Sequence, residues 1–78
     1  MEIWLTIEEC LGTDGEYSSD VCVCKSGQEA GELRAHLIAT MAKSMGVDVP
    51  DPTTVSEIKG DGWWYRVRIQ EEIIQWKD

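Results

Sequence analysis

Apolar and polar residues alternate at the start of the chain. Ile3, Leu5 and Ile7 are each separated by one residue, and this period of two predicts a strand with one buried face. We expect these three side chains to face the core. The stretch LGTDGEYSS supplies turn residues, with Asp14-Gly15 as the favoured reversal, and residues 21–24 predict a second strand. The two strands should form an antiparallel hairpin with a polar, acid-rich tip.

The middle of the chain predicts one amphipathic helix. Ser26 is followed three residues later by Glu29, which fits a capping box, and Gly46 can end the helix in a left-handed conformation. Apolar residues recur between them at helical spacing, and they are Ala30, Leu33, Leu37, Ile38, Met41 and Met45. The opposite side carries polar residues that we expect to be solvated, namely Glu32, His36, Thr40 and Lys43.

The segment VDVPDPTT returns the chain from the helix to the sheet, because Pro50 and Pro52 push the residues before them toward extended backbone. Beyond it, Asp61-Gly62 is a strong signal for a two-residue hairpin turn. Placing that pair at the tip predicts the cross-strand partners, which are Gly60 with Trp63, Lys59 with Trp64, Ile58 with Tyr65, Glu57 with Arg66, Ser56 with Val67 and Thr54 with Ile69.

This register sorts the second hairpin into an apolar face and a charged face, since neighbours along a strand point to opposite sides. The expected core face is lined by Ile58, Tyr65, Val67 and Ile69, with Trp63 at its margin. The expected outer face is lined by Val55, Glu57, Lys59, Trp64, Arg66 and Arg68.

Together these elements predict an α+β fold in a single domain, residues 1–78. We expect a four-stranded antiparallel sheet, in the order β-β-α-β-β along the chain, with the helix packed on one face. The tail EEIIQWKD is compatible with a last short strand or with a helical turn.

The chain is strongly acidic. Fifteen Asp and Glu residues oppose seven Lys and Arg, which gives a formal net charge of −8 and a pI near 4.4. Direct binding to nucleic acid or to an anionic membrane is disfavoured, because both require a cationic surface. A basic protein surface is the natural partner, although the same charge can serve solubility alone. The alternating N-terminus is not typical of a signal peptide, and no apolar run approaches the roughly 20 residues of a membrane span, so we expect a cytoplasmic location.

Carboxylates are concentrated around the first turn. No Lys or Arg occurs from Glu2 to Asp20, and five acids fall between positions 8 and 20, namely Glu8, Glu9, Asp14, Glu16 and Asp20. Strand residues two apart lie about 6.6 Å apart on one face, which is similar to the phosphate spacing of a nucleic-acid strand. The acids can therefore present charge to a phosphate-binding groove, or they can form a solvated surface that opposes edge-to-edge aggregation.

Trp64 stands among cations on the expected outer face, with Lys59 across the strand pair and Arg66 and Arg68 following it. One interpretation is a cation–π ladder that covers a sheet, and another is the anchor of a protein interface. We expect Trp4 on the same face, where the two tryptophans would form a patch for a homodimer or a partner to cover. Stacking of nucleic-acid bases on Trp64 is a third interpretation, which the net charge of −8 disfavours.

No constellation of residues indicates catalysis or metal binding. The odd number of cysteines fits reduced thiols. Cys22 and Cys24 are too close in sequence for a zinc knuckle and too far apart on one strand face for an unstrained disulfide. We interpret them, with Cys10, as small buried hydrophobes. His36 lacks a nucleophile partner, so we expect no enzyme activity, no metal and no cofactor.

In length, acidity and the acid-rich stretch IEECLGTDGEYSSD, the chain resembles the small phage-encoded inhibitors of bacterial defence, anti-CRISPR proteins among them. This resemblance is one of type across the whole chain and involves no shared motif. It implies an inhibitor that blocks a basic nucleic-acid-binding surface of a partner, such as a CRISPR effector, with carboxylates that mimic nucleic acid. The expected partner-binding residues are Glu8, Glu9, Asp14, Glu16, Asp20, Trp64, Arg66 and Arg68.

Two other functions fit the same features. The chain can be a small structural or assembly protein, dimeric through a Trp4 and Trp64 face. It can also be a regulatory subunit, such as an antitoxin that blocks a toxin.

Overall fold

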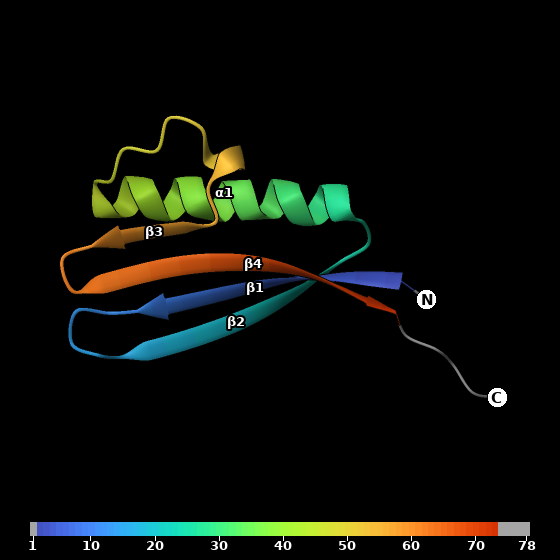
Figure 1. Ribbon diagram of the computed structural model, residues 1–78, viewed down its shortest axis with the longest axis horizontal. Helices are drawn as coiled ribbons and strands as arrows, with labels where there is room; N and C mark the ends of the chain where they lie inside the picture. Colours follow the sequence, from blue (N-terminus) through green and yellow to red (C-terminus); the bar gives the residue numbers. More distant parts are fainter. Residues whose placement is uncertain (1, 74–78) are drawn as a thin grey trace.

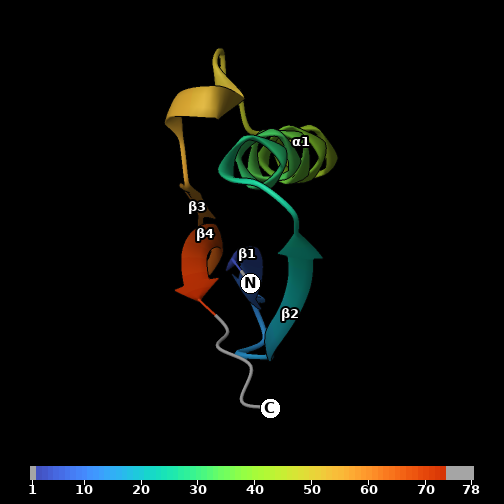
Figure 2. The same cartoon turned by 90° about the vertical axis from the view of Figure 1, so that its right-hand side faces the viewer.

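A computed structural model describes residues 2–73 of the chain. Its elements are β1 (Glu2–Leu11), β2 (Tyr17–Cys24), α1 (Gly27–Met45), the short 3-10 helix η1 (Pro52–Thr54), β3 (Glu57–Gly60) and β4 (Trp63–Ile73). The strands form one antiparallel sheet in the order β2-β1-β4-β3 (Figure 1). The helix lies on one side of this sheet (Figure 2). The predicted α+β fold is confirmed. The first residues of the tail EEIIQWKD continue β4, and the rest lie outside the described residues.

Helix α1 begins and ends where its capping residues predict. The Ser26 hydroxyl accepts a hydrogen bond from the Glu29 backbone N–H at 3.1 Å, and the Glu29 carboxylate in turn accepts one from the Lys25 N–H at 3.3 Å. Gly46 ends the helix with a φ of 71°, a left-handed conformation that glycine adopts without steric cost.

The second hairpin has the predicted register. Glu57, Ile58, Lys59 and Gly60 pair with Arg66, Tyr65, Trp64 and Trp63. The buried core combines its inner face with the helix and consists of Ile38, Ala42, Ile58, Tyr65 and Val67. Two details of the prediction are wrong. Thr54 lies in η1 and does not pair with Ile69, and Val55 packs against the core instead of the outer face.

The first hairpin is longer than predicted, and its faces are inverted. Pairing of β1 with β4 places Cys10 beside Tyr65 and Glu8 beside Val67, so the even-numbered residues of β1 share the face that the helix covers. Ile3, Leu5 and Ile7 therefore point to the opposite side, and our prediction that they face the core is wrong. The alternation alone did not decide between the faces, because apolar residues occur on both.

Apart from Trp4, the residues that face the helix from the first hairpin are small or polar. Thr6 and Cys24 are buried, with Thr6 Oγ1 and Cys24 Sγ 3.6 Å apart. Trp4 packs against Gly27 at the start of α1, where a Cβ atom would lie 3.2 Å from the indole ring. Trp4 is thus on the helix side of the sheet. Our prediction that it shares the outer face with Trp64 is wrong. Cys22 is exposed, which corrects its interpretation as a buried hydrophobe.

Candidate functional site

The side of the sheet away from α1 is covered by no other element within residues 2–73, and we call it the uncovered face (Figure 2). The strand pairing assigns its members. They are Tyr17, Ser19, Val21 and Val23 from β2; Ile3, Leu5, Ile7, Glu9 and Leu11 from β1; Trp64, Arg66, Arg68, Gln70 and Glu72 from β4; and Glu57 and Lys59 from β3.

Glu9 is the centre of a polar cluster at one end of the uncovered face. Its carboxylate accepts hydrogen bonds from the Tyr17 hydroxyl at 2.7 Å, from Arg66 Nη2 at 3.3 Å and from Arg68 Nε at 2.9 Å. The Tyr17 hydrogen bond, followed by those of the two arginines, lowers the pKa of Glu9 to about 2. Glu9 is therefore charged, neutralised within the molecule and buried.

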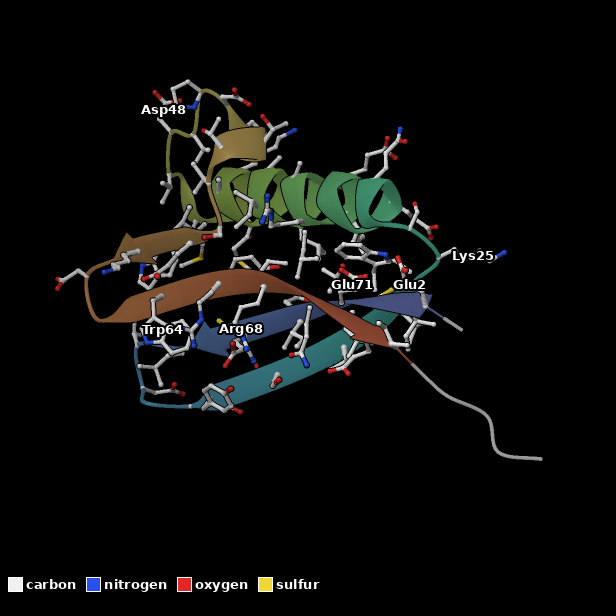
Figure 3. The ribbon with its side chains drawn as sticks, turned by 45° about the vertical axis from the view of Figure 1, so that its right-hand side comes forward. Glu2, Lys25, Asp48, Trp64, Arg68 and Glu71 are labelled. Carbon is white, nitrogen blue, oxygen red and sulfur yellow. The ribbon has the colours of Figure 1, made fainter. Side chains whose placement is uncertain are left out.

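Trp64 belongs to the same cluster. The Arg66 guanidinium lies over its ring at 5.0 Å from the centroid, and Tyr17 meets it edge to face at 6.2 Å. Figure 3 shows Trp64 and Arg68 on the side of the sheet away from the helix. Of the predicted cation–π ladder, the structure shows the contact between Arg66 and Trp64. Tyr17 was not predicted as a member of this cluster, because the stretch LGTDGEYSS was interpreted as a turn, whereas β2 begins at Tyr17.

Glu8 and Asp20 lie on the helix side of the sheet, apart from this cluster. They are direct cross-strand partners, so their side chains leave the sheet next to each other. The Glu8 carboxylate accepts a hydrogen bond from the Tyr65 hydroxyl at 2.6 Å, and burial, followed by that hydrogen bond, raises the pKa of Tyr65. Within residues 2–73, neither Glu8 nor Asp20 forms an ion pair.

Asp20 also closes part of the free edge of the sheet. Its carboxylate accepts a hydrogen bond from the Val21 backbone N–H at 3.1 Å, and β2 is an edge strand. An edge N–H that is already bonded is less available to a strand of another molecule.

The remaining two predicted site residues, Asp14 and Glu16, lie in the exposed turn between β1 and β2. The Asp14 carboxylate accepts a hydrogen bond from the Glu16 N–H at 3.1 Å and so stabilises the turn. The five acids predicted as one site are therefore divided between the uncovered face, the helix side and the turn.

A groove runs between α1 and β2 on the helix side, and we call it the α1–β2 groove. It consists of two adjacent hollows of about 320 and 250 Å³, and both are lined by Glu8 and Asp20. Its apolar lining comes from Leu33, Leu37 and Met41 of the helix and from Tyr65. These helix residues belong to the apolar stripe predicted from the sequence, and no signal in the sequence showed that part of this stripe borders an open groove.

Charge is unequally divided between the two sides of the sheet. The uncovered face carries three acids (Glu9, Glu57 and Glu72) and three bases (Lys59, Arg66 and Arg68), so its formal charge is zero. Lys77 and Asp78, beyond the described residues, cancel each other. The net charge of −8 of the chain therefore belongs to the helix side, the turns and the margins of the sheet.

Comparison with known proteins gives no further guide. No family model matches the chain, and neither a curated protein nor a solved structure is significantly similar to it. In the part of the chain that the structure describes, no helix has the length and apolarity needed to cross a membrane, and no group of three or more His, Cys, Asp or Glu side chains is arranged to hold a metal ion. The α1–β2 groove and the uncovered face are thus the two candidate sites.

Proposed function

We propose that this protein is a protein-binding inhibitor whose α1–β2 groove engages a basic surface of its partner. The observation that carries the proposal is the Glu8 and Asp20 pair. Two carboxylates stand opposite each other at the wall of an apolar groove, and like charges in directly opposite strand positions repel. A cation from a partner, placed between them, would relieve that repulsion.

The lining of the groove suits lysine or arginine. The side chains of these residues have a long apolar stem and a charged end. The stem can pack along Leu33, Leu37 and Met41 while the charged end reaches the carboxylates of Glu8 and Asp20. A charge-assisted hydrogen bond of this kind is stronger than one between neutral groups.

The rest of the acidic side would attract such a partner from a distance. Asp14 and Glu16 are exposed in the neighbouring turn, and no base pairs with them in the described part of the chain. A negative field of this kind raises association rates with a basic surface. Proteins bind nucleic acid through surfaces rich in Lys and Arg. A partner whose basic surface is bound by this protein could therefore not bind its nucleic acid. This is the role implied by the resemblance to anti-CRISPR inhibitors.

Four of the site residues predicted from the sequence have a different role in this proposal, and one of them is Trp64, which packs with Arg66 and Tyr17 on the uncovered face. Glu9, Arg66 and Arg68 satisfy one another on the uncovered face and are not offered to a basic partner. The proposed site is accordingly formed by Glu8 and Asp20, with Asp14 and Glu16 beside it.

The test is a comparison of two doubly neutralised variants. Glu8→Gln/Asp20→Asn removes the charges at the groove and keeps oxygens that can accept from Tyr65 and from the Val21 N–H. Glu32→Gln/Asp48→Asn removes the same charge from exposed positions elsewhere. Each protein is immobilised and exposed to a nuclease-treated bacterial lysate at low salt, and the captured proteins are identified.

We expect the wild type and the Glu32/Asp48 variant to capture the same basic protein, and the groove variant to lose it. Rising salt or added DNA or RNA should release the captured protein. Capture by the groove variant at the wild-type level would contradict the proposal. Equal losses in both variants would mean that only the overall charge matters.

A further inference from the structure

We infer that the uncovered face binds a second copy of this chain and forms a symmetric dimer in which two sheets pack face to face. The central observation is that one half of this face is aliphatic. Ile3, Leu5 and Ile7 from β1 lie beside Val21 and Val23 from β2, and the two valines are 55% and 62% exposed. The three β1 side chains are half-buried and form a contiguous apolar patch with the exposed valines, and such a patch is typical of an interaction site.

The distribution of charge over the molecule indicates which partner binds to the uncovered face. The uncovered face has no net formal charge, whereas the other surfaces carry the full −8 of the chain. Two copies that approach by any other side repel each other, and only this face allows close approach. A basic partner gains more from the acidic side than from a neutral face. The second copy is therefore the occupant that fits.

Every acid of the face already has a partner within its own copy, which lowers the cost of removing it from water, although the Arg66 Nε group is a buried donor without a partner among the described residues. Glu9 binds Tyr17, Arg66 and Arg68. Glu57 and Lys59 form an ion pair at 3.4 Å, and Gln70 donates a hydrogen bond to Glu72. Each acid on the face thus has a partner within its own copy, and a charge that is paired and hydrogen-bonded is the kind that tolerates burial.

The position of the aliphatic half determines where the two-fold axis of the dimer lies. In a symmetric interface the same patch meets itself, so the axis must pass through the region of Leu5, Ile7, Val21 and Val23 for the apolar side chains to meet. Trp64 and Arg66 then lie toward the rim. Packed sheets of this kind lie about 10 Å apart.

Pairing through the edge of β2 is a different geometry and fits less well. The Asp20 carboxylate already occupies the Val21 N–H at the free edge, and two copies of Asp20 would be brought close together. Edge pairing would also leave the valines exposed. The uncovered face is limited in size, because the three strands β1, β2 and β4 together are about 14 Å wide. We therefore expect a reversible dimer whose population depends on concentration.

The test is sedimentation equilibrium of the full chain over about a hundredfold range of concentration. Val23→Glu introduces a charge at the centre of the aliphatic half, at a position too exposed to destabilise the monomer, and should weaken dimerisation at least about tenfold. Met45→Glu is the matched control, because Met45 is an exposed apolar residue of the helix, and it should dimerise as the wild type does. Trp64→Ala should have a smaller effect than Val23→Glu.

Hydrogen exchange of the β2 backbone distinguishes the two geometries. In the face-to-face dimer, the Val21 amide stays at a free edge and its exchange does not slow with concentration. Slower exchange of this amide in the dimer would indicate edge pairing and would overturn the inference. A wild type that stays monomeric at every concentration, or a Val23→Glu variant that dimerises normally, would overturn it as well.

Discussion

The two hairpins of the sheet use their apolar residues in opposite ways. The β3–β4 hairpin points Ile58, Tyr65 and Val67 toward the helix, and all three are buried. The β1–β2 hairpin points Val21 and Val23 away from the helix, where both are exposed. One hairpin therefore supplies the core of the monomer, while the other presents apolar surface to the outside. The large apolar side chains of the two hairpins thus lie on opposite faces of one continuous sheet.

The largest expected difference between the hairpins is in the cost of truncating a valine. Val67 is fully buried in the core, so Val67→Ala should lower the free energy of unfolding by about 2–3 kcal/mol. Val23→Ala should lower it by less than about 1 kcal/mol, because Val23 is already exposed to water. Urea denaturation at a concentration low enough to keep the chain monomeric measures both. Equal costs would mean that the two hairpins do not differ in this way.

This contrast also explains which predictions from the sequence succeeded. In the second hairpin, Ile58, Tyr65 and Val67 alternate with charged residues, so only one register buries the apolar set. In the first hairpin, Ile3, Leu5 and Ile7 alternate with Trp4 and other residues that also tolerate burial. The face that the helix covers is decided there by long-range pairing of β1 with β4, which periodicity does not report.

The candidate site was predicted less well than the fold, for a related reason. The acid-rich stretch was correctly located near the first turn, but alternation sends Glu8 and Glu9 to opposite faces. Glu9 meets Arg66 and Arg68, more than fifty residues away in the sequence. From composition alone, Glu9 is counted as an unpaired charge. Its partners become apparent only from the order of the strands in the sheet.

The glycines at the two hairpin turns give the second prediction. A Cβ atom on Gly60 would overlap the Trp63 indole, so Gly60→Ala should cost about 1–3 kcal/mol as the ring is displaced from the core margin. Gly15 has open space around it and a φ of 82°. Gly15→Ala should cost only the conformational strain, about 1 kcal/mol. Thermal unfolding of both variants checks the order, and a larger loss for Gly15→Ala would contradict it.

The two tyrosine–carboxylate hydrogen bonds give a third, smaller contrast. Tyr65 is buried and donates to Glu8, whereas Tyr17 is 54% exposed and donates to Glu9. Tyr65→Phe should lower the free energy of unfolding by about 1 kcal/mol. Tyr17→Phe should have less effect on unfolding, because water can replace its hydroxyl at Glu9. Urea denaturation of the two variants, with the wild type as reference, decides the order.

Acid titration of Glu9 gives the smallest expected effect. The hydrogen bond from Tyr17, then those from Arg66 and Arg68, hold its pKa at about 2, below the usual 4.5. A carboxyl group with a lowered pKa in the folded state stabilises the protein fully above its unfolded pKa, and this contribution is lost as the pH falls through the folded value. Stability should therefore decline between about pH 4.5 and pH 2. The decline should be modest, since the Arg66 and Arg68 side chains are 40% and 52% exposed and water screens them.

Two variants isolate this contribution from the other acids. Glu9→Gln should flatten the dependence of the unfolding free energy on pH in that window. Glu8→Gln should retain the Glu9 contribution, because it leaves the Glu9 cluster intact on the opposite face of the sheet. If the wild type and Glu9→Gln lose stability in parallel on acidification, Glu9 is not held by Tyr17 and the two arginines in solution. The uncovered face would then carry an unneutralised acid, which would also raise the cost of burying that face against a second copy.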